Sequence, residues 1–285
     1  MTEAKVELSG FEERYLDARG CRLRYLVAGR GEPLLLVHGL GGAASNWCEL
    51  APLLAPRWRL LIPDLPGHAG SSPFPAAPTL NPFADVVAAM AEREGMLPAP
   101  IVGHSLGGVV ALRLALRRPE AVTALVLAAT AGISSSTRVK ETWVTLLVLA
   151  RPARLVAPHR GLIARVSWLR YPVFGHWEVA DPPSLAPRAV EGFLVGPRLH
   201  TDIRDAGRAL VRADTRTDLH RVRCPALVVW GARDRIVPLQ DGYEYARRLR
   251  APLRVVPDCG HLLIGERPDA CAHAIESFLA PLAAR

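Results

Sequence analysis

The chain has 285 residues, half of them hydrophobic, which is enough to bury the core of one large domain or of two smaller ones. No apolar run approaches the roughly 20 residues that span a bilayer, and the charged N-terminus lacks the apolar segment of a signal peptide. The formal charge is +8, but the arginines are scattered and accompany no recognition motif, which argues against nucleic acid as a partner.

Short apolar runs alternate with helical patterns through the first part of the chain. Six runs predict strands, at 11–18, 21–28, 33–37, 58–62, 99–102 and 122–128. Helical patterns cover three segments between them, at 45–54, 83–94 and 109–116. Most of these strands lack polar alternation, which is typical of a largely parallel sheet covered by helices on both faces.

The pattern changes after Ala131. Residues 132–218 show helical periodicity, many prolines and no buried-strand run. Alternation then resumes with a strand, a helix, a strand and a closing helix at 225–230, 243–250, 253–256 and 268–279. The fold class is therefore predicted to be α/β, with a core domain of residues 1–131 and 219–285 and a helical cap, or lid, of residues 132–218.

A candidate nucleophile lies at Gly103-His104-Ser105-Leu106-Gly107, which matches the pattern G-x-S-x-G between a strand and a helix. On such a turn the serine backbone is strained, and glycine on either side relieves the crowding. A competing interpretation gives the glycines a role in close helix–sheet packing and makes Ser105 a helix cap. The two interpretations differ in whether a base, an acid and oxyanion donors accompany the serine.

Asp234 and His261 are the candidate acid and base. Each follows a predicted strand, and open α/β sheets place their sites at the carboxyl ends of strands. The chain order Ser, Asp, His is the one that this strand–turn–helix arrangement uses. Competing acids are Asp258, close to His261 in sequence, and Asp64.

The other histidines compete as the base. His104 is next to the serine, but adjacent side chains on so sharp a turn are expected to point apart. His68 lies in a Pro/Gly loop and His273 inside a helix, where satisfied surface or core roles are commoner. Two backbone N–H groups complete the candidate site as an oxyanion hole. Leu106 follows the serine directly, and Leu40 follows the strand at 33–37.

Five ordered motifs together resemble the α/β-hydrolase superfamily over nearly the whole chain apart from the lid. They are His38-Gly39, the run from Asp64 to Ser71, the run from Gly103 to Gly108, Gly231-Ala232-Arg233-Asp234, and Gly260-His261. The resemblance implies an eight-stranded, mostly parallel sheet with a helical cap inserted after the sixth strand. It also implies Ser105, Asp234 and His261 as a catalytic triad.

Differences from the motifs of known subfamilies limit which reactions the chain is expected to catalyse. Haloalkane dehalogenases and epoxide hydrolases need aspartate where this chain has Ser105, and haloperoxidase relatives usually have Phe at position 104. The C–C hydrolases of meta-cleavage pathways usually carry Asn and Trp where this chain has His104 and Leu262. The His104-Ser105-Leu106-Gly107-Gly108 form is commonest among esterases and lipases.

The sequence thus predicts a serine hydrolase that cleaves a carboxylic ester of an apolar acyl group through an acyl-enzyme. Alternatives are a C–C bond, thioester or lactone hydrolase on the same triad, or a low-turnover binding protein of the same fold. Five cysteines at unrelated spacings form no metal-ligand pattern, so we expect reduced thiols, a cytoplasmic protein, and neither metal nor cofactor. The expected partner is a small apolar ester, with no stable membrane insertion, and the sequence leaves the oligomeric state open.

The lid combines apolar side chains with many arginines over residues 138–170, where Glu141 is the only acid. One interpretation is a helical hairpin that packs its apolar side on the core and turns its arginines to solvent. The other is an apolar acyl pocket rimmed by positive charge, suited to a lipid-like or carboxylate-bearing ester.

Overall fold

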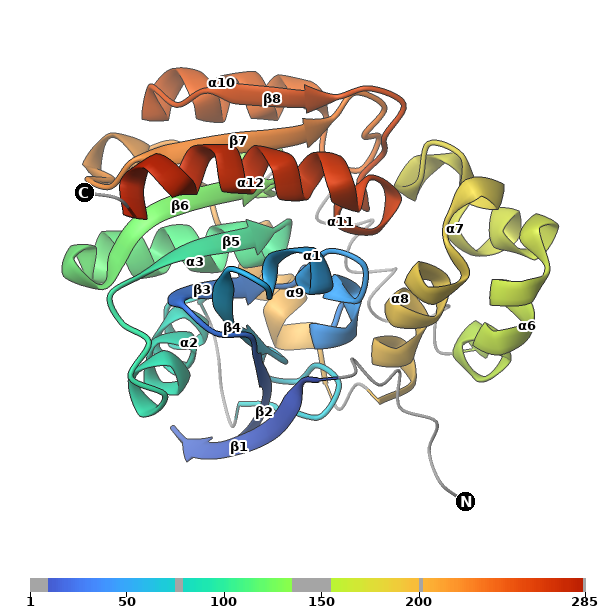
Figure 1. The fold of residues 1–285 in the computed structure, drawn as a ribbon, viewed down its shortest axis with the longest axis horizontal. Helices are drawn as coiled ribbons and strands as arrows, with labels where there is room; N and C mark the ends of the chain where they lie inside the picture. The colour runs from blue at the N-terminus through green and yellow to red at the C-terminus, as the bar shows by residue number, and fades with distance from the viewer. Residues whose placement is uncertain (1–9, 75–78, 135–154, 200–201, 284–285) are drawn as a thin grey trace.

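A single eight-stranded sheet forms the centre of the protein. The computed structural model describes residues 10–74, 79–134, 155–199 and 202–283 (Figure 1). The strands are β1 (Glu12–Ala18), β2 (Cys21–Ala28), β3 (Glu32–Val37), β4 (Trp58–Pro63), β5 (Ala99–His104), β6 (Val122–Ala128), β7 (Ala226–Gly231) and β8 (Leu253–Val256). Their order in the sheet is β1-β2-β4-β3-β5-β6-β7-β8, and all pairs from β4 to β8 are parallel. The predicted α/β fold with its mostly parallel sheet is confirmed.

The antiparallel edge of the sheet begins with a tight hairpin. Ala18 of β1 pairs with Cys21 of β2, and the two residues between them, Arg19 and Gly20, have φ angles of 53° and 75°. Positive φ at both central positions is the conformation whose twist suits a two-residue hairpin. Strand β3, by contrast, is buried over its last four residues, as expected of a strand covered on both faces.

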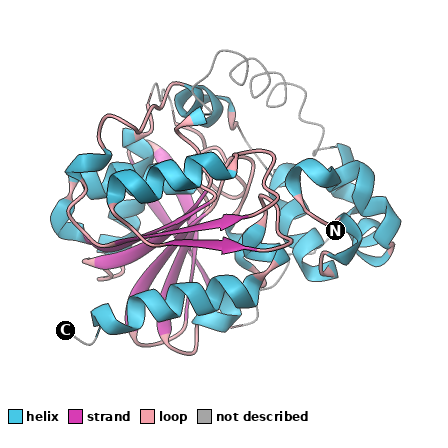
Figure 2. Ribbon diagram, turned by 90° about the horizontal axis from the view of Figure 1, so that it is seen from above, coloured by secondary structure: helices cyan, strands magenta, loops and turns pink. Residues whose placement is uncertain are grey.

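Helices cover both faces of the sheet (Figure 2). In the core these are η1 (Ala44–Trp47), α1 (Ala51–Leu54), α2 (Asn81–Arg93), α3 (Leu106–Arg117), η2 (Pro119–Ala121), α10 (Leu239–Leu249), α11 (Leu263–Glu266) and α12 (Pro268–Ala283). Helix α1 packs against α12, while α2 packs against α3. The burial of their apolar faces against the sheet produces one continuous hydrophobic core.

Two helices differ from the sequence prediction. The single helix predicted over 45–54 is two short pieces, η1 and α1, and Pro52 lies in the first turn of α1, where its missing N–H removes no intrahelical hydrogen bond. Helix α10 starts at Leu239 rather than near Tyr243. Its first turn contains Gly242, a poor helix former, and a Cβ there would come within 2.9 Å of the Trp230 ring. Close packing on β7 therefore decides this helix start.

Helical elements fill the described part of the chain between β6 and β7. They are η4 (Ala157–His159), α6 (Arg160–Arg165), η5 (Ser167–Leu169), α7 (Arg170–Glu178), η6 (Pro182–Ser184), α8 (Pro187–Leu199), α9 (Arg204–Val211) and η7 (Leu219–Arg221). Figure 1 shows strands β5, β7 and β8 pointing toward α7 and α8. The division into core and lid at 132 and 218 stays a prediction, and much of the predicted hairpin, residues 135–154, lies outside the described residues.

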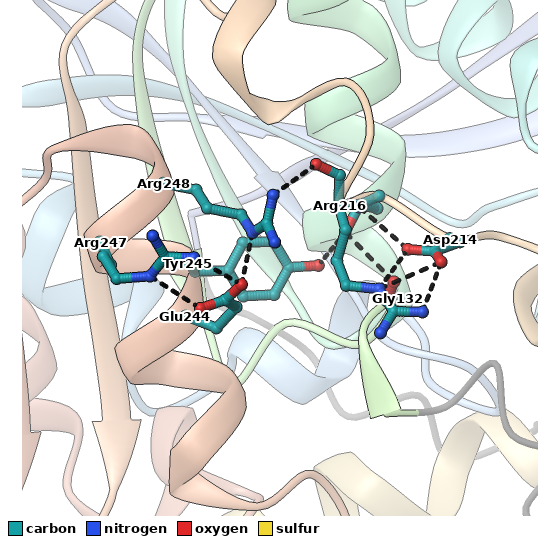
Figure 3. Close-up of polar contacts among 8 residues, drawn as sticks. Gly132, Asp214, Arg216, Glu244, Tyr245, Arg247 and Arg248 are labelled. Atoms are coloured by element: carbon teal, nitrogen blue, oxygen red, sulfur yellow. Dashed lines mark hydrogen bonds and ion pairs between the residues drawn. The ribbon is translucent and has the colours of Figure 1, made fainter.

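The two ends of this helical segment meet at a buried hydrogen-bond cluster (Figure 3). Gly132 accepts hydrogen bonds through its carbonyl oxygen from the Thr215 N–H and hydroxyl, at 2.9 and 3.2 Å. The Tyr245 hydroxyl of α10 lies 2.8 Å from the Thr215 hydroxyl and donates to the Ala131 carbonyl. Farther out, the Ser45 hydroxyl donates to the Gly192 carbonyl of α8 at 2.7 Å. These contacts fix the helical segment over the carboxyl edge of the sheet.

Candidate active site

Ser105 occupies the turn between β5 and α3. Its φ and ψ are 53° and −115°, a conformation that non-glycine residues rarely adopt, and its side chain is largely buried. The following helix starts directly at Leu106, so the serine lies at a helix N-terminus. At Gly107 a Cβ would come within 2.1 Å of the Val37 carbonyl oxygen, which explains why the motif needs glycine there. The turn has the strained backbone that the sequence predicted.

Asp234 and His261 meet although 26 residues separate them in the chain. The Asp234 carboxylate accepts a hydrogen bond from His261 Nδ1 at 2.8 Å, and both side chains are buried. The other carboxylate oxygen accepts the N–H groups of Ile236 and Val237, each at 2.9 Å. This carboxylate is therefore held on both oxygens, and the proton on Nδ1 leaves Nε2 of His261 free to accept another.

The competing acids have other roles. Asp258 is exposed and forms an ion pair with Arg233 at 2.5 Å. Asp64 is buried under the loop after β3 and has several partners there. Neither takes the place of Asp234 beside the imidazole.

His104 links the serine turn to the His261 loop. From the sequence, we expected the His104 side chain to point away from that of Ser105. In the structure its ring packs against the His261 ring, with 5.0 Å between the ring centroids. His104 Nε2 donates to the His261 carbonyl oxygen at 2.9 Å. Burial, together with the nearby His261, lowers the pKa of His104 to about 3, so this ring stays neutral. His104 therefore acts as a fixed hydrogen-bond donor that joins the loops after β5 and β8.

A buried network holds the loop that contains Leu40. Asp64, which follows β4, accepts the Ala44 N–H at 2.7 Å and the Arg24 guanidinium at 2.7 Å. The oxygen that accepts from Arg24 also accepts the Gly70 N–H, at 3.2 Å. The carboxylate therefore joins three segments of backbone around the end of β3.

Two buried histidines complete this network. His38 Nε2 accepts the Leu65 N–H at 3.0 Å, and His68 Nε2 accepts the Gly41 N–H at 3.1 Å. Their rings lie 5.0 Å apart, and burial lowers the pKa of His38, which favours the neutral acceptor form. Sequence reasoning gave His68 only a satisfied surface or core role and gave Asp64 only the place of an alternative acid.

The N–H groups of Leu40 and Leu106 are available as donors. Within the part of the chain that the structure describes, neither of them donates a hydrogen bond to a protein acceptor. Leu106 is the first residue of α3, where helical N–H groups lack intrahelical acceptors. Leu40 lies between two anchored residues, since Gly39 accepts the Gly42 N–H through its carbonyl and Gly41 donates to His68.

Two further carboxyl groups surround the His261 loop, and sequence reasoning missed both. Glu178, at the end of α7, accepts the N–H groups of His261 and Leu262 through its backbone carbonyl at 2.7 and 3.2 Å. Burial raises the pKa of its carboxyl to about 7, partly offset by His261. Glu266 accepts the Gly260 N–H at 3.0 Å and the Ala180 N–H at 2.9 Å. The end of α7 is therefore fastened to the His261 loop.

The carboxyl edge of the sheet carries the candidate nucleophile close in the fold to a paired histidine and carboxylate. Among the residues described by the structure, no three His, Cys, Asp or Glu side chains lie close enough to bind a metal ion. What the carboxyl edge brings together is a strained serine turn, a paired histidine and carboxylate, and two unengaged N–H groups.

The Asp64 network yields a stability prediction. We expect Asp64→Ala to lower the free energy of unfolding by about 3–5 kcal/mol, because it leaves the Arg24 guanidinium, the buried Ala44 N–H and the Gly70 N–H without this acceptor. Glu120→Ala, which removes an exposed carboxylate 3.6 Å from Arg118, should cost less than about 1 kcal/mol. Urea denaturation of the two variants measures both values, and equal losses would contradict the role given to Asp64.

Comparison with known proteins places the chain among enzymes of related architecture. It is 30% identical to the dihydrolipoyllysine-residue acetyltransferase component of an acetoin cleaving system from Pseudomonas putida, over 92% of this chain and 68% of that relative. It is 31% identical to a pimeloyl-[acyl-carrier protein] methyl ester esterase from Chromobacterium violaceum, over 82% and 88% of the two chains. A 2-hydroxymuconate semialdehyde hydrolase from Pseudomonas sp. strain CF600 is 30% identical, over 94% and 93%.

Solved structures and family comparison agree with these relatives. A hydrolase from Pseudomonas aeruginosa PA01 superimposes with a TM-score of 0.73 and 27% identity, covering 94% of this chain and 98% of that one. The sequence model of the alpha/beta hydrolase family matches residues 34–274, which include every candidate site residue named above. The match begins in β3 and ends in α12, so it spans both parts of the sheet core. The chain therefore belongs to the alpha/beta hydrolase family and is a hydrolase.

Proposed function

We propose that this protein is a serine hydrolase that cleaves a carboxylic ester of an apolar acyl group, with Ser105, His261 and Asp234 as its catalytic triad. The observation that carries the proposal is the buried Asp234–His261 hydrogen bond of 2.8 Å, in a loop joined through His104 to the strained serine turn. A serine hydroxyl is a weak nucleophile at neutral pH and needs a base of this kind. A binding protein of the same fold would not need this paired carboxylate and imidazole.

In the proposed reaction the Ser105 hydroxyl attacks the ester carbonyl while His261 Nε2 takes its proton. The imidazolium that forms is stabilised by Asp234, which keeps its own negative charge. Collapse of the tetrahedral intermediate breaks the ester bond, and His261 returns the proton to the leaving alcohol. Water then attacks the acyl-enzyme by the same route, releases the carboxylic acid and restores the serine.

The negative charge on the tetrahedral intermediate needs fixed donors, and we assign this role to the N–H groups of Leu40 and Leu106. Both are unengaged in the described structure, and each lies on an anchored backbone. Because such donors do not reorganise during the reaction, each is worth about 3–4 kcal/mol of barrier. The Asp64, His38 and His68 contacts would then serve catalysis by holding Leu40 in place.

The ester assignment is supported by the pimeloyl-[acyl-carrier protein] methyl ester esterase among the relatives. A second candidate, cleavage of a C–C bond by the same triad, is favoured by the similarity to 2-hydroxymuconate semialdehyde hydrolase. We prefer ester cleavage because C–C hydrolases of this kind usually have Trp after the histidine and Asn before the serine. This chain has Leu262 and His104 at those two positions. We also propose a cytoplasmic location, since all five cysteines are free thiols.

Removal of the nucleophile gives the first test. Ser105→Ala should lower hydrolysis of p-nitrophenyl esters by several orders of magnitude, because no other group replaces the hydroxyl, and should leave the melting temperature nearly unchanged. It should also abolish labelling by a fluorophosphonate probe. Ser167→Ala, at an exposed serine, is the matched control and should keep both activities. Undiminished labelling of the Ser105→Ala protein would rule out Ser105 as the nucleophile.

The pH dependence tests the base. Burial acts to lower the pKa of His261, but Asp234, through charge and hydrogen bond, and then Glu178 and Glu266 raise it above its usual 6.5. Only neutral His261 accepts a proton, so kcat/KM should rise with pH along a limb whose midpoint lies above 6.5.

Asp234→Asn removes the largest of these favourable interactions, so it should shift that midpoint down and lower kcat by about 10⁴-fold. Asp258→Asn, at the exposed carboxylate paired with Arg233, should change neither. Steady-state kinetics across the pH range measures both quantities. A midpoint in the Asp234→Asn variant equal to that of the unaltered protein would contradict the assigned pair.

A further inference from the structure

Large apolar side chains are exposed on one part of the helical segment. Leu155, Leu162, Trp168, Tyr171 and Trp177 expose 77%, 56%, 68%, 42% and 53% of their surface, all within 23 consecutive residues. Single exposed apolar residues are normal, but several large ones exposed on neighbouring helices indicate an interaction site. Figure 1 shows α6 and α7, which carry most of them, at the rim of the molecule away from the sheet.

The inward side of the same helices is fixed, which determines what faces outward. Ile163, Ala164 and Phe174 are buried, and the buried Arg170 guanidinium donates to the carbonyl oxygens of Ala164 and Leu185, both at 2.6 Å. Arg170 is thus used inside the helical segment rather than at its surface.

The exposed side chains follow a regular spacing. Leu162, Arg165, Trp168 and Tyr171 occur at every third position and are all exposed. With Leu155 and Trp177 they make up most of the exposed surface that α6, η5 and α7 contribute, which we call the α6–α7 face.

The basic side chains of this face indicate an anionic partner. Residues 155–177 contain no Asp or Glu, while Arg160, Arg165, His159 and His176 lie among the apolar positions. A second copy of the chain, related by twofold symmetry, would bring these basic groups together, and residues 155–177 offer no carboxylate to pair with them. An anionic lipid surface instead complements the charge, and Trp and Tyr side chains are suited to the boundary between headgroups and acyl chains.

The α6–α7 face is connected to the candidate active site. Helix α7 ends at Glu178, and the Glu178 carbonyl accepts the N–H of His261 at 2.7 Å. A lipid layer in contact with α7 would therefore lie beside the loop that carries the proposed base.

We propose that the α6–α7 face docks on an anionic lipid surface and presents the active site to esters held in that surface. The second half of this statement rests on the proposed function, whereas the docking itself does not. The apolar and aromatic side chains enter the boundary region, and Arg165 contacts the anionic headgroups.

Vesicle binding by the full-length Ser105→Ala protein tests the docking without any hydrolysis. We expect sedimentation with vesicles of phosphatidylglycerol and phosphatidylcholine, weaker binding as salt is raised, and little binding to phosphatidylcholine alone. Adding Arg165→Glu or Trp168→Ser should weaken binding about tenfold or more. Matched controls, Arg254→Glu on β8 and Tyr243→Ser on α10, remove an exposed arginine and an exposed aromatic elsewhere and should leave binding unchanged.

The same substitutions on the active chain should leave hydrolysis of the soluble ester p-nitrophenyl acetate unaltered, which shows that the fold is intact. No binding of the Ser105→Ala protein to phosphatidylglycerol vesicles would overturn the docking proposal, even if esters are hydrolysed. Equal loss in the control variants would also overturn it. So would a dimer that Trp168→Ser converts to a monomer, in size-exclusion chromatography, with unchanged vesicle binding. Vesicle binding without ester hydrolysis would support docking and instead contradict the proposed function.

Discussion

The hydrogen bond between Asp234 and His261 is the interaction on which the geometry of the candidate active site depends. It joins the loops after β7 and β8, and Asp234 is itself held by two backbone N–H groups. The parallel sheet makes this possible, because neighbouring parallel strands end at the same edge and bring distant parts of the chain together. His104 extends the connection to the serine turn after β5, so three loops depend on one another. A displaced loop would disturb all of them.

The surrounding polar network is extensive because the loops at this edge are buried under helices. Buried N–H and carbonyl groups need partners, and Asp64, His38, His68 and Glu266 supply them. The same contacts that satisfy the backbone also fix Leu40 and the His261 turn. Stability and site geometry therefore have a common physical origin in this region.

Local sequence patterns predicted the sheet well. A buried parallel strand is a continuous apolar run, and the predicted runs ending at Val37, Ala128 and Trp230 each lie in strands of the structure. The strained turn at Ser105 was predicted from a signal that is also local, because Gly103 and Gly107 each lie two residues from the serine.

The contacts that sequence reasoning missed join residues that are far apart. His104 to His261 spans 157 positions, and Glu178 meets the His261 loop through its backbone, which no side-chain pattern reveals. Gly242 misled the placement of α10 because its role is tertiary, close packing on Trp230. The boundaries of the lid, at residues 132 and 218, stay a prediction, because a change of periodicity in the sequence does not show where one structural unit ends and another begins.

A structure of the protein after reaction with an alkylphosphonate tests the central claim most directly, because the tetrahedral phosphorus mimics the proposed intermediate. We expect phosphorus bonded to Ser105 Oγ and its oxygen within hydrogen-bond distance of the Leu40 and Leu106 N–H groups. His261 Nε2 should lie beside Ser105 Oγ, with the Asp234 contact unbroken. Phosphorus on any other residue, or an oxygen directed away from both N–H groups, would contradict the proposed triad and oxyanion hole.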